Sequence, residues 1–130
     1  MPRKTKATKR TVKAKVSDQR TCPRLRISLR DGLILGPGKV ELLEAIEQEG
    51  SISGAARTMG MSYRRAWLLV DALNRMFDAP AVITSPGGAH GGGAEITELG
   101  KDVAAAYRRI EKRANVAIRE ELGPLSKDID

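Results

Sequence analysis

The sequence predicts a mainly α-helical domain with one small β-hairpin. Three observations support this fold class: a pair of short helices separated by glycine in residues 50–77, a glycine-rich stretch at 85–94 between two β-like segments, and a long amphipathic segment at about 97–122. With 130 residues, the chain has room for a single domain with a modest core.

Charge separates this domain from a basic tail. Residues 1–20 hold eight Lys or Arg and one Asp, whereas the whole chain holds 23 Lys or Arg and 16 Asp or Glu. The net charge of +7 therefore belongs to the tail, and residues 21–130 hold fifteen charges of each sign. Residues 1–21 lack hydrophobic periodicity, so we expect disorder, either as an electrostatic arm for nucleic acid or as a solubilising segment. Residues 22–130 form the predicted domain.

The domain begins with a short strand and a helix. Residues 24–30 alternate between polar and apolar side chains, as in a half-buried strand, and Asp31-Gly32 favours a turn. A helix is expected from about 36 to 49, with apolar residues inward and glutamates outward. Its Gly-Pro-Gly-Lys start lacks the glycine spacing of a nucleotide-binding loop.

The helix pair in residues 50–77 has clear start and stop signals. Ser51 or Ser53 can cap the first helix, because a hydroxyl there accepts a hydrogen bond from a free backbone N–H group. Gly60 ends that helix, and Ser62 caps the second, at about 62–77. Two helices joined by a short turn with glycine are typical of a helix-turn-helix.

The exposed face of the second helix indicates DNA binding. Its opening residues Tyr63, Arg64 and Arg65 lie at the end that a recognition helix inserts into the major groove. Arginine there can pair with guanine O6 and N7 or contact phosphate. Trp67 lies at the boundary of the buried face, where packing is the more common role. The alternative is a plain helical hairpin with solvated arginines.

The glycine-rich stretch at 85–94 is interpreted as the wing of a DNA-binding domain, a β-hairpin with a long tip. Residues 81–84 and 95–97 are expected to be short strands, and the loop at 85–94 contains five glycines and His90. Glycines let backbone N–H groups approach phosphates closely; the alternative is a flexible connector. Together these segments predict a winged helix-turn-helix.

The last helix is predicted to join two copies of the chain. A helix of about 25 residues is about 37 Å long, longer than a domain of this size covers. Part of its apolar stripe should therefore bury against a second chain; the alternative is a helix packed wholly on its own domain. The stripe, and so the predicted dimer interface, consists of Val103, Tyr107, Ile110, Ala114 and Ile118.

The motifs resemble the N-terminal DNA-binding domain of the ModE family, molybdate-responsive bacterial regulators with a winged helix-turn-helix related to that of LysR-type regulators. Ser-Ile-Ser-x-x-Ala, Gly-x-Ser-Tyr-x-x-Ala-Trp, Gly-Gly-x-x-Gly-Gly-Gly-Ala and Ile-Thr-x-x-Gly occur in order within about residues 24–122. The resemblance implies operator binding as a dimer. The residues that match its helix-turn-helix motif are Ser51, Ser53, Ser62, Tyr63, Arg64 and Trp67.

Three departures limit the resemblance. Thr84 and Ala89 stand where the family usually or often carries a basic residue, although His90 is adjacent to Ala89. The sequence ends at Asp130, from which we expect no molybdate-binding domain and no molybdate site within this chain. The expectation is a stand-alone DNA-binding domain.

The sequence therefore predicts a cytoplasmic, homodimeric transcriptional regulator that binds double-stranded DNA. Two other classes stay open: a nucleoid or architectural protein that binds DNA through the basic tail, and a protein–protein module that uses the acidic helix at 36–49.

An enzyme is not expected, because the sequence shows no paired carboxylates, metal cluster or nucleophile constellation. The lone Cys22 and lone His90 make neither a disulfide nor a metal site. No cofactor is expected, and no apolar run has transmembrane length.

Overall fold

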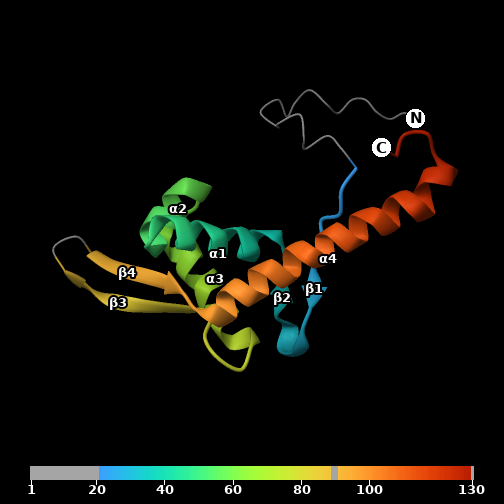
Figure 1. Ribbon diagram of the computed structural model, residues 1–130. Helices are drawn as coiled ribbons and strands as arrows, with labels where there is room; N and C mark the ends of the chain where they lie inside the picture. The colour runs from blue at the N-terminus through green and yellow to red at the C-terminus, as the bar shows by residue number, and fades with distance from the viewer. Residues whose placement is uncertain (1–20, 89–90, 130) are drawn as a thin grey trace. The chain divides into compact units, whose positions relative to one another are not determined.

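The computed structural model describes residues 21–88 and 91–129. Arg24–Lys112 forms one compact unit, and the two ends of the chain belong to a second unit. Figure 1 shows the elements, which in chain order are β1 (Ile27–Ser28), η3 (Arg30–Gly32), β2 (Ile34–Leu35), α1 (Pro37–Glu49), α2 (Ile52–Met59), α3 (Tyr63–Met76), β3 (Val82–Gly88), β4 (Gly91–Ile96), α4 (Glu98–Leu122) and η4 (Gly123–Leu125).

The core of the larger unit is built on α1. This helix packs against α2, and α2 packs against α3. Ala55 and Ala56 are buried on α2, and their small side chains let the neighbouring helices approach closely. The largest fully buried side chains are Tyr107, Leu42, Leu43, Ile46, Leu73, Val40, Val70 and Val82.

The predicted helix ends are confirmed. The Ser51 hydroxyl accepts a hydrogen bond from the Gly54 N–H at 2.9 Å, and the Ser62 hydroxyl accepts one from the Arg65 N–H at 3.0 Å. Gly60 ends α2 with φ of 70°, a left-handed conformation that glycine adopts without a Cβ clash. Ser51, not Ser53, is therefore the cap of α2.

The predicted fold class was wrong. The described residues form four α-helices and two small antiparallel sheets, rather than a winged helix-turn-helix with a dimerisation helix. One sheet, the β1–β2 pair, was not predicted as such: only one strand was expected at 24–30, because the two residues of β2 are too few to show an alternating pattern. The pairing sets Ile27 opposite Leu35 across the turn at Asp31, whose φ is 61°.

The β3–β4 hairpin is fixed at its base by contacts with α1 and α3. Val82 pairs with Ile96 and Thr84 with Ala94, and the Ala94 N–H donates to the Gly50 carbonyl at 2.9 Å. The hairpin and the three preceding helices are thereby held as one body (Figure 1).

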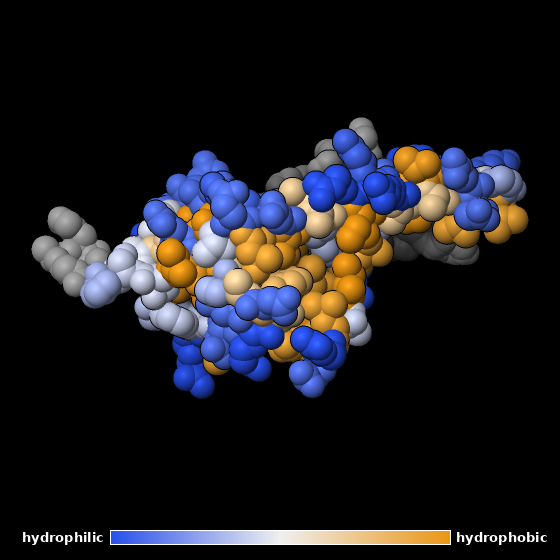
Figure 2. All heavy atoms as spheres, turned by 60° about the horizontal axis from the view of Figure 1, so that its bottom comes forward, coloured by the Kyte–Doolittle hydropathy of each residue, from blue (hydrophilic) through white to orange (hydrophobic). Residues whose placement is uncertain are grey.

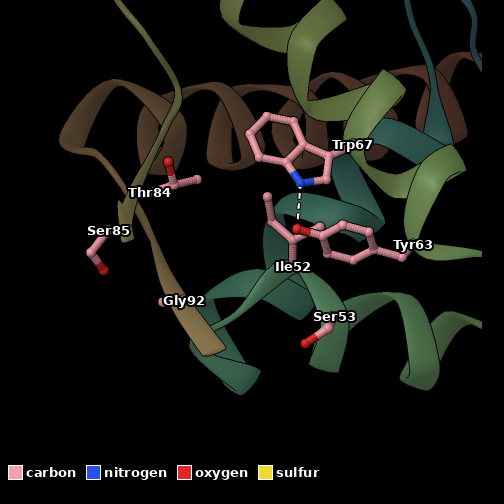
Figure 3. A pocket seen from close by; sticks show the side chains of 8 residues that line it. Ile52, Ser53, Tyr63, Trp67, Thr84, Ser85 and Gly92 are labelled. Atoms are coloured by element: carbon pink, nitrogen blue, oxygen red, sulfur yellow. Dashed lines mark hydrogen bonds between the residues drawn. The ribbon is translucent and has the colours of Figure 1, made fainter. Parts of the chain in front are cut away.

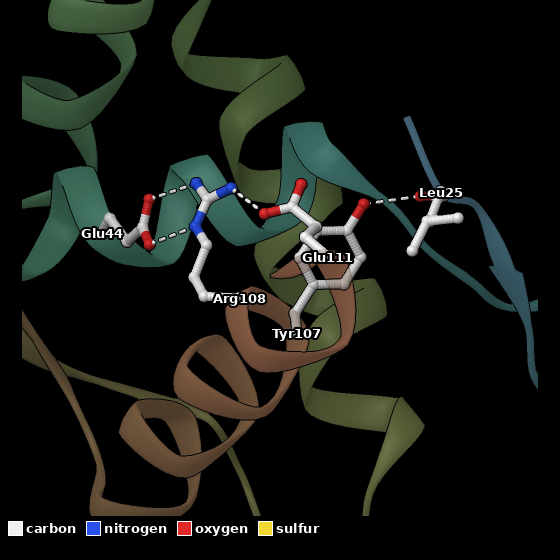
Figure 4. A network of polar contacts seen from close by, with 5 residues as sticks. All are labelled: Leu25, Glu44, Tyr107, Arg108 and Glu111. Carbon is white, nitrogen blue, oxygen red and sulfur yellow. Dashed lines mark hydrogen bonds and ion pairs between the residues drawn. The ribbon is translucent and has the colours of Figure 1, made fainter. Parts of the chain in front are cut away.

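The first half of α4 is attached to the same body by polar contacts (Figure 4). Arg108 donates two hydrogen bonds to Glu44 of α1, at 2.9 and 2.7 Å, and one to Glu111 at 2.7 Å. The pKa of Arg108 is raised, chiefly by the hydrogen bond with Glu44. Tyr107 donates to the Leu25 carbonyl at 2.6 Å. Glu44, predicted to face outward on an acidic surface, is therefore already paired.

These contacts also correct the interpretation of the α4 stripe. Val103 and Tyr107 are buried in the core of their own chain, so their apolar character is explained without a second copy. Ile110 is 42% exposed, whereas Ala114 and Ile118 are half-buried. A dimer through these last three residues stays a prediction.

Candidate nucleic-acid interface

A cleft of about 470 Å³ opens between α2, the start of α3 and the β3–β4 hairpin. We call it the α3–hairpin cleft. Figure 3 shows Ser53 and Ile52 on one side, Tyr63 and Trp67 on another, and the hairpin residues opposite. It is lined by Ile52, Ser53, Tyr63, Trp67, Thr84, Ser85, Gly92 and Gly93.

Tyr63 and Trp67 form a preorganised pair at this cleft. They are one helical turn apart on α3, and Trp67 Nε1 donates a hydrogen bond to Tyr63 Oη at 2.6 Å (Figure 3). Tyr63 is 55% exposed and Trp67 38% exposed. The hydrogen bond uses the phenol as an acceptor, which leaves its O–H free to donate. Trp67, for which packing was the more common expectation, thus faces the cleft.

The two arginines at the start of α3 point in different directions. Residues two apart on a helix with 3.6 residues per turn lie nearly opposite one another, so Arg64 lies opposite the buried Ala66 and faces solvent. Arg65 instead lines another cleft, on a different face of α3 from Tyr63 and Trp67. The predicted basic pair is therefore divided between two surfaces.

The serines also divide into two roles. The Ser51 and Ser62 oxygens accept capping hydrogen bonds, so these side chains position the helices. Ser53 is exposed and lines the α3–hairpin cleft. His90 lies outside the described residues.

The hairpin presents a surface of small side chains to this cleft. Thr84, Ser85 and Gly92 are exposed. Figure 2 shows the hairpin as a pale region at the left, as expected for residues of intermediate hydropathy. A Cβ added at Gly93 would lie 3.1 Å from the Ser85 hydroxyl and 3.6 Å from the Gly50 carbonyl, so glycine permits close packing at this point.

Asn74 holds the hairpin against α3, and it was not predicted from the sequence. Its Oδ1 accepts hydrogen bonds from the Ala81 and Val82 N–H groups, at 2.8 and 3.0 Å, and its Nδ2 donates to the Val82 carbonyl at 3.0 Å. An asparagine inside a helix was the available signal, because its side chain tends to bond to backbone groups elsewhere.

The described part of the chain supports neither a metal site nor a membrane-spanning helix. No group of three or more His, Cys, Asp or Glu side chains gathers there as metal ligands would. No helix among these residues combines the length and the apolar character that crossing a membrane requires.

The chain is similar to proteins named for molybdenum-pterin binding, for molybdenum transport and for transcriptional regulation. No protein-family model matches it. It is 46% identical over 94 residues, 72% of this chain, to the molybdenum-pterin-binding protein MopB of Rhodobacter capsulatus. It is 39% identical over 88 residues, 68% of this chain, to the molybdenum transport protein ModE of Azotobacter vinelandii. It is 34% identical over 83 residues, 64% of this chain, to the DNA-binding transcriptional dual regulator ModE of Escherichia coli K12.

The relatives correct two expectations. The resemblance was assigned to the DNA-binding N-terminal domain of the ModE family alone, and a molybdate site was excluded from this chain. The relative at 46% identity is named for molybdenum-pterin binding, and so is MopA of the same organism, at 44% identity over 77 residues. Assignment to a DNA-binding domain alone is therefore wrong, and the exclusion of a molybdate site is withdrawn.

The match covers a limited part of the relatives. The chain spans 35% of MopB, 33% of the Azotobacter vinelandii protein and 32% of the Escherichia coli protein, or about a third of each. It is thus similar to one portion of molybdenum-pterin-binding Mop proteins and of ModE regulators.

Proposed function

We propose that this chain acts in molybdenum-dependent transcriptional regulation and binds double-stranded DNA through the α3–hairpin cleft and the adjoining start of α3. The observation that carries the proposal is the grouping of exposed polar and aromatic side chains from three separate elements around one cleft. The Escherichia coli relative, named as a DNA-binding regulator, supports it.

Each part of this surface suits a different contact with DNA. Arg64 projects from the start of α3, where a guanidinium reaches base edges in the major groove or a phosphate. The Tyr63 O–H and the Ser53 hydroxyl supply neutral donors of the kind that bond to phosphate oxygens. Thr84 and Ser85 place further hydroxyls on the hairpin. The Asn74 contacts with residues 81 and 82 fix the spacing between α3 and the hairpin.

Arg64→Ala tests this assignment. A duplex selected from random DNA by the wild-type chain should bind the variant more weakly by about 1–3 kcal/mol, with relaxed preference at one base position. Fluorescence anisotropy at fixed salt measures both effects. The matched control is Arg75→Ala on the same helix: Arg75 is exposed and pairs with Asp71 at 3.2 Å, a contact of little energetic weight. If the two variants bind alike, Arg64 does not read DNA.

A second candidate function is the binding of a molybdenum-containing ligand, which the names of the two Mop relatives favour. The test is equilibrium dialysis of the chain against molybdate, with protein-bound molybdenum measured by mass spectrometry. Saturable binding near one ion per chain supports this function. Molybdenum no higher on the protein side than in the buffer would exclude molybdate as the ligand.

A further inference from the structure

A second cleft lies on another face of α3. Its volume is about 450 Å³, and it is bounded by Arg26 before β1, by the segment from Gly32 to Lys39, and by α3 from Arg65 to Ala72. Three basic side chains from these separate segments line it: Arg26, Lys39 and Arg65. We call it the basic cleft.

The three positive charges are not neutralised by neighbouring acids. None of the ion pairs among the described residues involves Arg26, Lys39 or Arg65. The pKa of Lys39 is lowered, first by burial and then by repulsion from Arg26 and Arg65. Like charges kept together in a partly buried cleft oppose one another, and a bound anion would relieve that repulsion.

The basic cleft is open to an anion at Gly38. Gly36 and Gly38 line it without side chains, and a Cβ added at Gly38 would meet no atom within 4 Å. The Arg26 stem lies over Gly36, where a Cβ would be 3.6 Å from Arg26 Cγ. The backbone N–H groups at the start of α1 add a partial positive charge to that of the three side chains. No acidic residue in the first turn of this helix offsets it.

We propose that the basic cleft binds a tetrahedral oxyanion of the phosphate class, held by Arg26, Lys39 and Arg65. Two sources share this chemistry: a backbone phosphate of bound DNA and a free oxyanion. The first source rests on the proposed DNA-binding function and extends the contact surface from the start of α3 to the β2–α1 junction. The second does not depend on DNA.

The double variant Arg26→Gln with Lys39→Gln separates these sources. Both side chains lie on the surface or partly exposed, so the fold should survive, as checked by circular dichroism and urea unfolding. The control is Arg109→Gln with Lys112→Gln, which removes the same charge from exposed positions of α4. Arg65 stays in place, because it adjoins the proposed DNA surface.

In the DNA arm, affinity for a selected duplex is measured by anisotropy at several salt concentrations. A phosphate held in the basic cleft predicts that the double variant binds about tenfold more weakly than the control. Its slope of log affinity against log salt should be smaller by about 0.9. In the free-anion arm, phosphate, sulfate and molybdate are titrated into isotopically labelled wild-type chain, and the Gly38 amide signal is followed by NMR. A saturable shift that the double variant lacks identifies a free oxyanion.

A positive result in either the DNA experiment or the free-anion experiment supports the proposal and identifies the source of the bound oxyanion. A double variant that matches its control in affinity and salt slope, together with an unshifted Gly38 signal, would overturn it. That result would leave the proposed function intact if the wild-type chain still bound duplex DNA. Conversely, a wild-type chain that binds no duplex refutes the proposed function, and the free-anion arm then decides alone.

Discussion

Asn74→Ala is expected to destabilise the fold by about 3 kcal/mol and to weaken DNA binding as well. The substitution removes three hydrogen bonds and leaves the backbone groups of Ala81 and Val82 without those partners, although both residues are buried. A buried polar group left unsatisfied costs about 1–3 kcal/mol. Because these bonds also set the hairpin against α3, the two sides of the proposed DNA-binding surface should lose their fixed spacing. Urea unfolding and anisotropy measure the two effects.

Asn74→Asp is the informative companion variant. It keeps the oxygen that accepts from the Ala81 and Val82 N–H groups, but it replaces the donor to the Val82 carbonyl with a second acceptor oxygen. We therefore expect a smaller loss of unfolding free energy than for Asn74→Ala. A difference of about 0.5 kcal/mol or less is typical of surface positions. If the free energy of unfolding of Asn74→Ala differed from that of the wild type by no more than this, Asn74 would not hold the hairpin against α3.

Gly100→Ala is expected to lower the free energy of unfolding by about 3 kcal/mol, the upper part of the range for overpacked cores. A Cβ at this position would overlap the Ala81 carbonyl oxygen and lie 2.7 Å from Ile96 Cγ1. The first turns of α4 therefore lie directly against the hairpin base, and backbone would have to move. Helix propensity alone predicts the opposite sign, because alanine is favoured over glycine inside a helix by about 1 kcal/mol.

Gly38→Ala is the matched control for that experiment. Gly38 lies in the first turn of α1, and a Cβ there would meet no atom within 4 Å. This variant should be as stable as the wild type or more stable by up to about 1 kcal/mol. If thermal and urea unfolding showed that Gly100→Ala stabilises the chain as Gly38→Ala does, α4 would not pack closely on the hairpin base at Gly100.

Local features of the fold were predictable from sequence because their causes lie within a few residues. The caps at Ser51 and Ser62 and the left-handed Gly60 depend on hydrogen bonds and backbone angles inside one turn. The bounds of α1, α3 and α4 accordingly agree with prediction to within one residue at most ends. Strand bounds agreed less well, because pairing and the irregularity between Ser85 and Gly88 depend on the partner strand.

The two proposed binding surfaces were only partly predictable. Tyr63 was singled out as an opening residue of the second helix, and Trp67 through the family resemblance, with packing as its more common role. Their orientation toward the hairpin depends on packing between segments distant in sequence. The cluster of Arg26, Lys39 and Arg65 was missed for the same reason, since no sequence pattern links these three positions. Assigning one domain of a family from short motifs was also unsafe, because the motifs carry no information on what else the relatives bind.

The most direct test of DNA binding at the α3–hairpin cleft is the fluorescence of Trp67. It is the only tryptophan in the sequence, lies in the cleft and is 38% exposed. Titration with the selected duplex should change its emission saturably and protect the ring from quenching by acrylamide, because DNA would cover it. An anisotropy signal that reports binding while emission and quenching stay unchanged would contradict the account, since the DNA would then lie elsewhere on the chain.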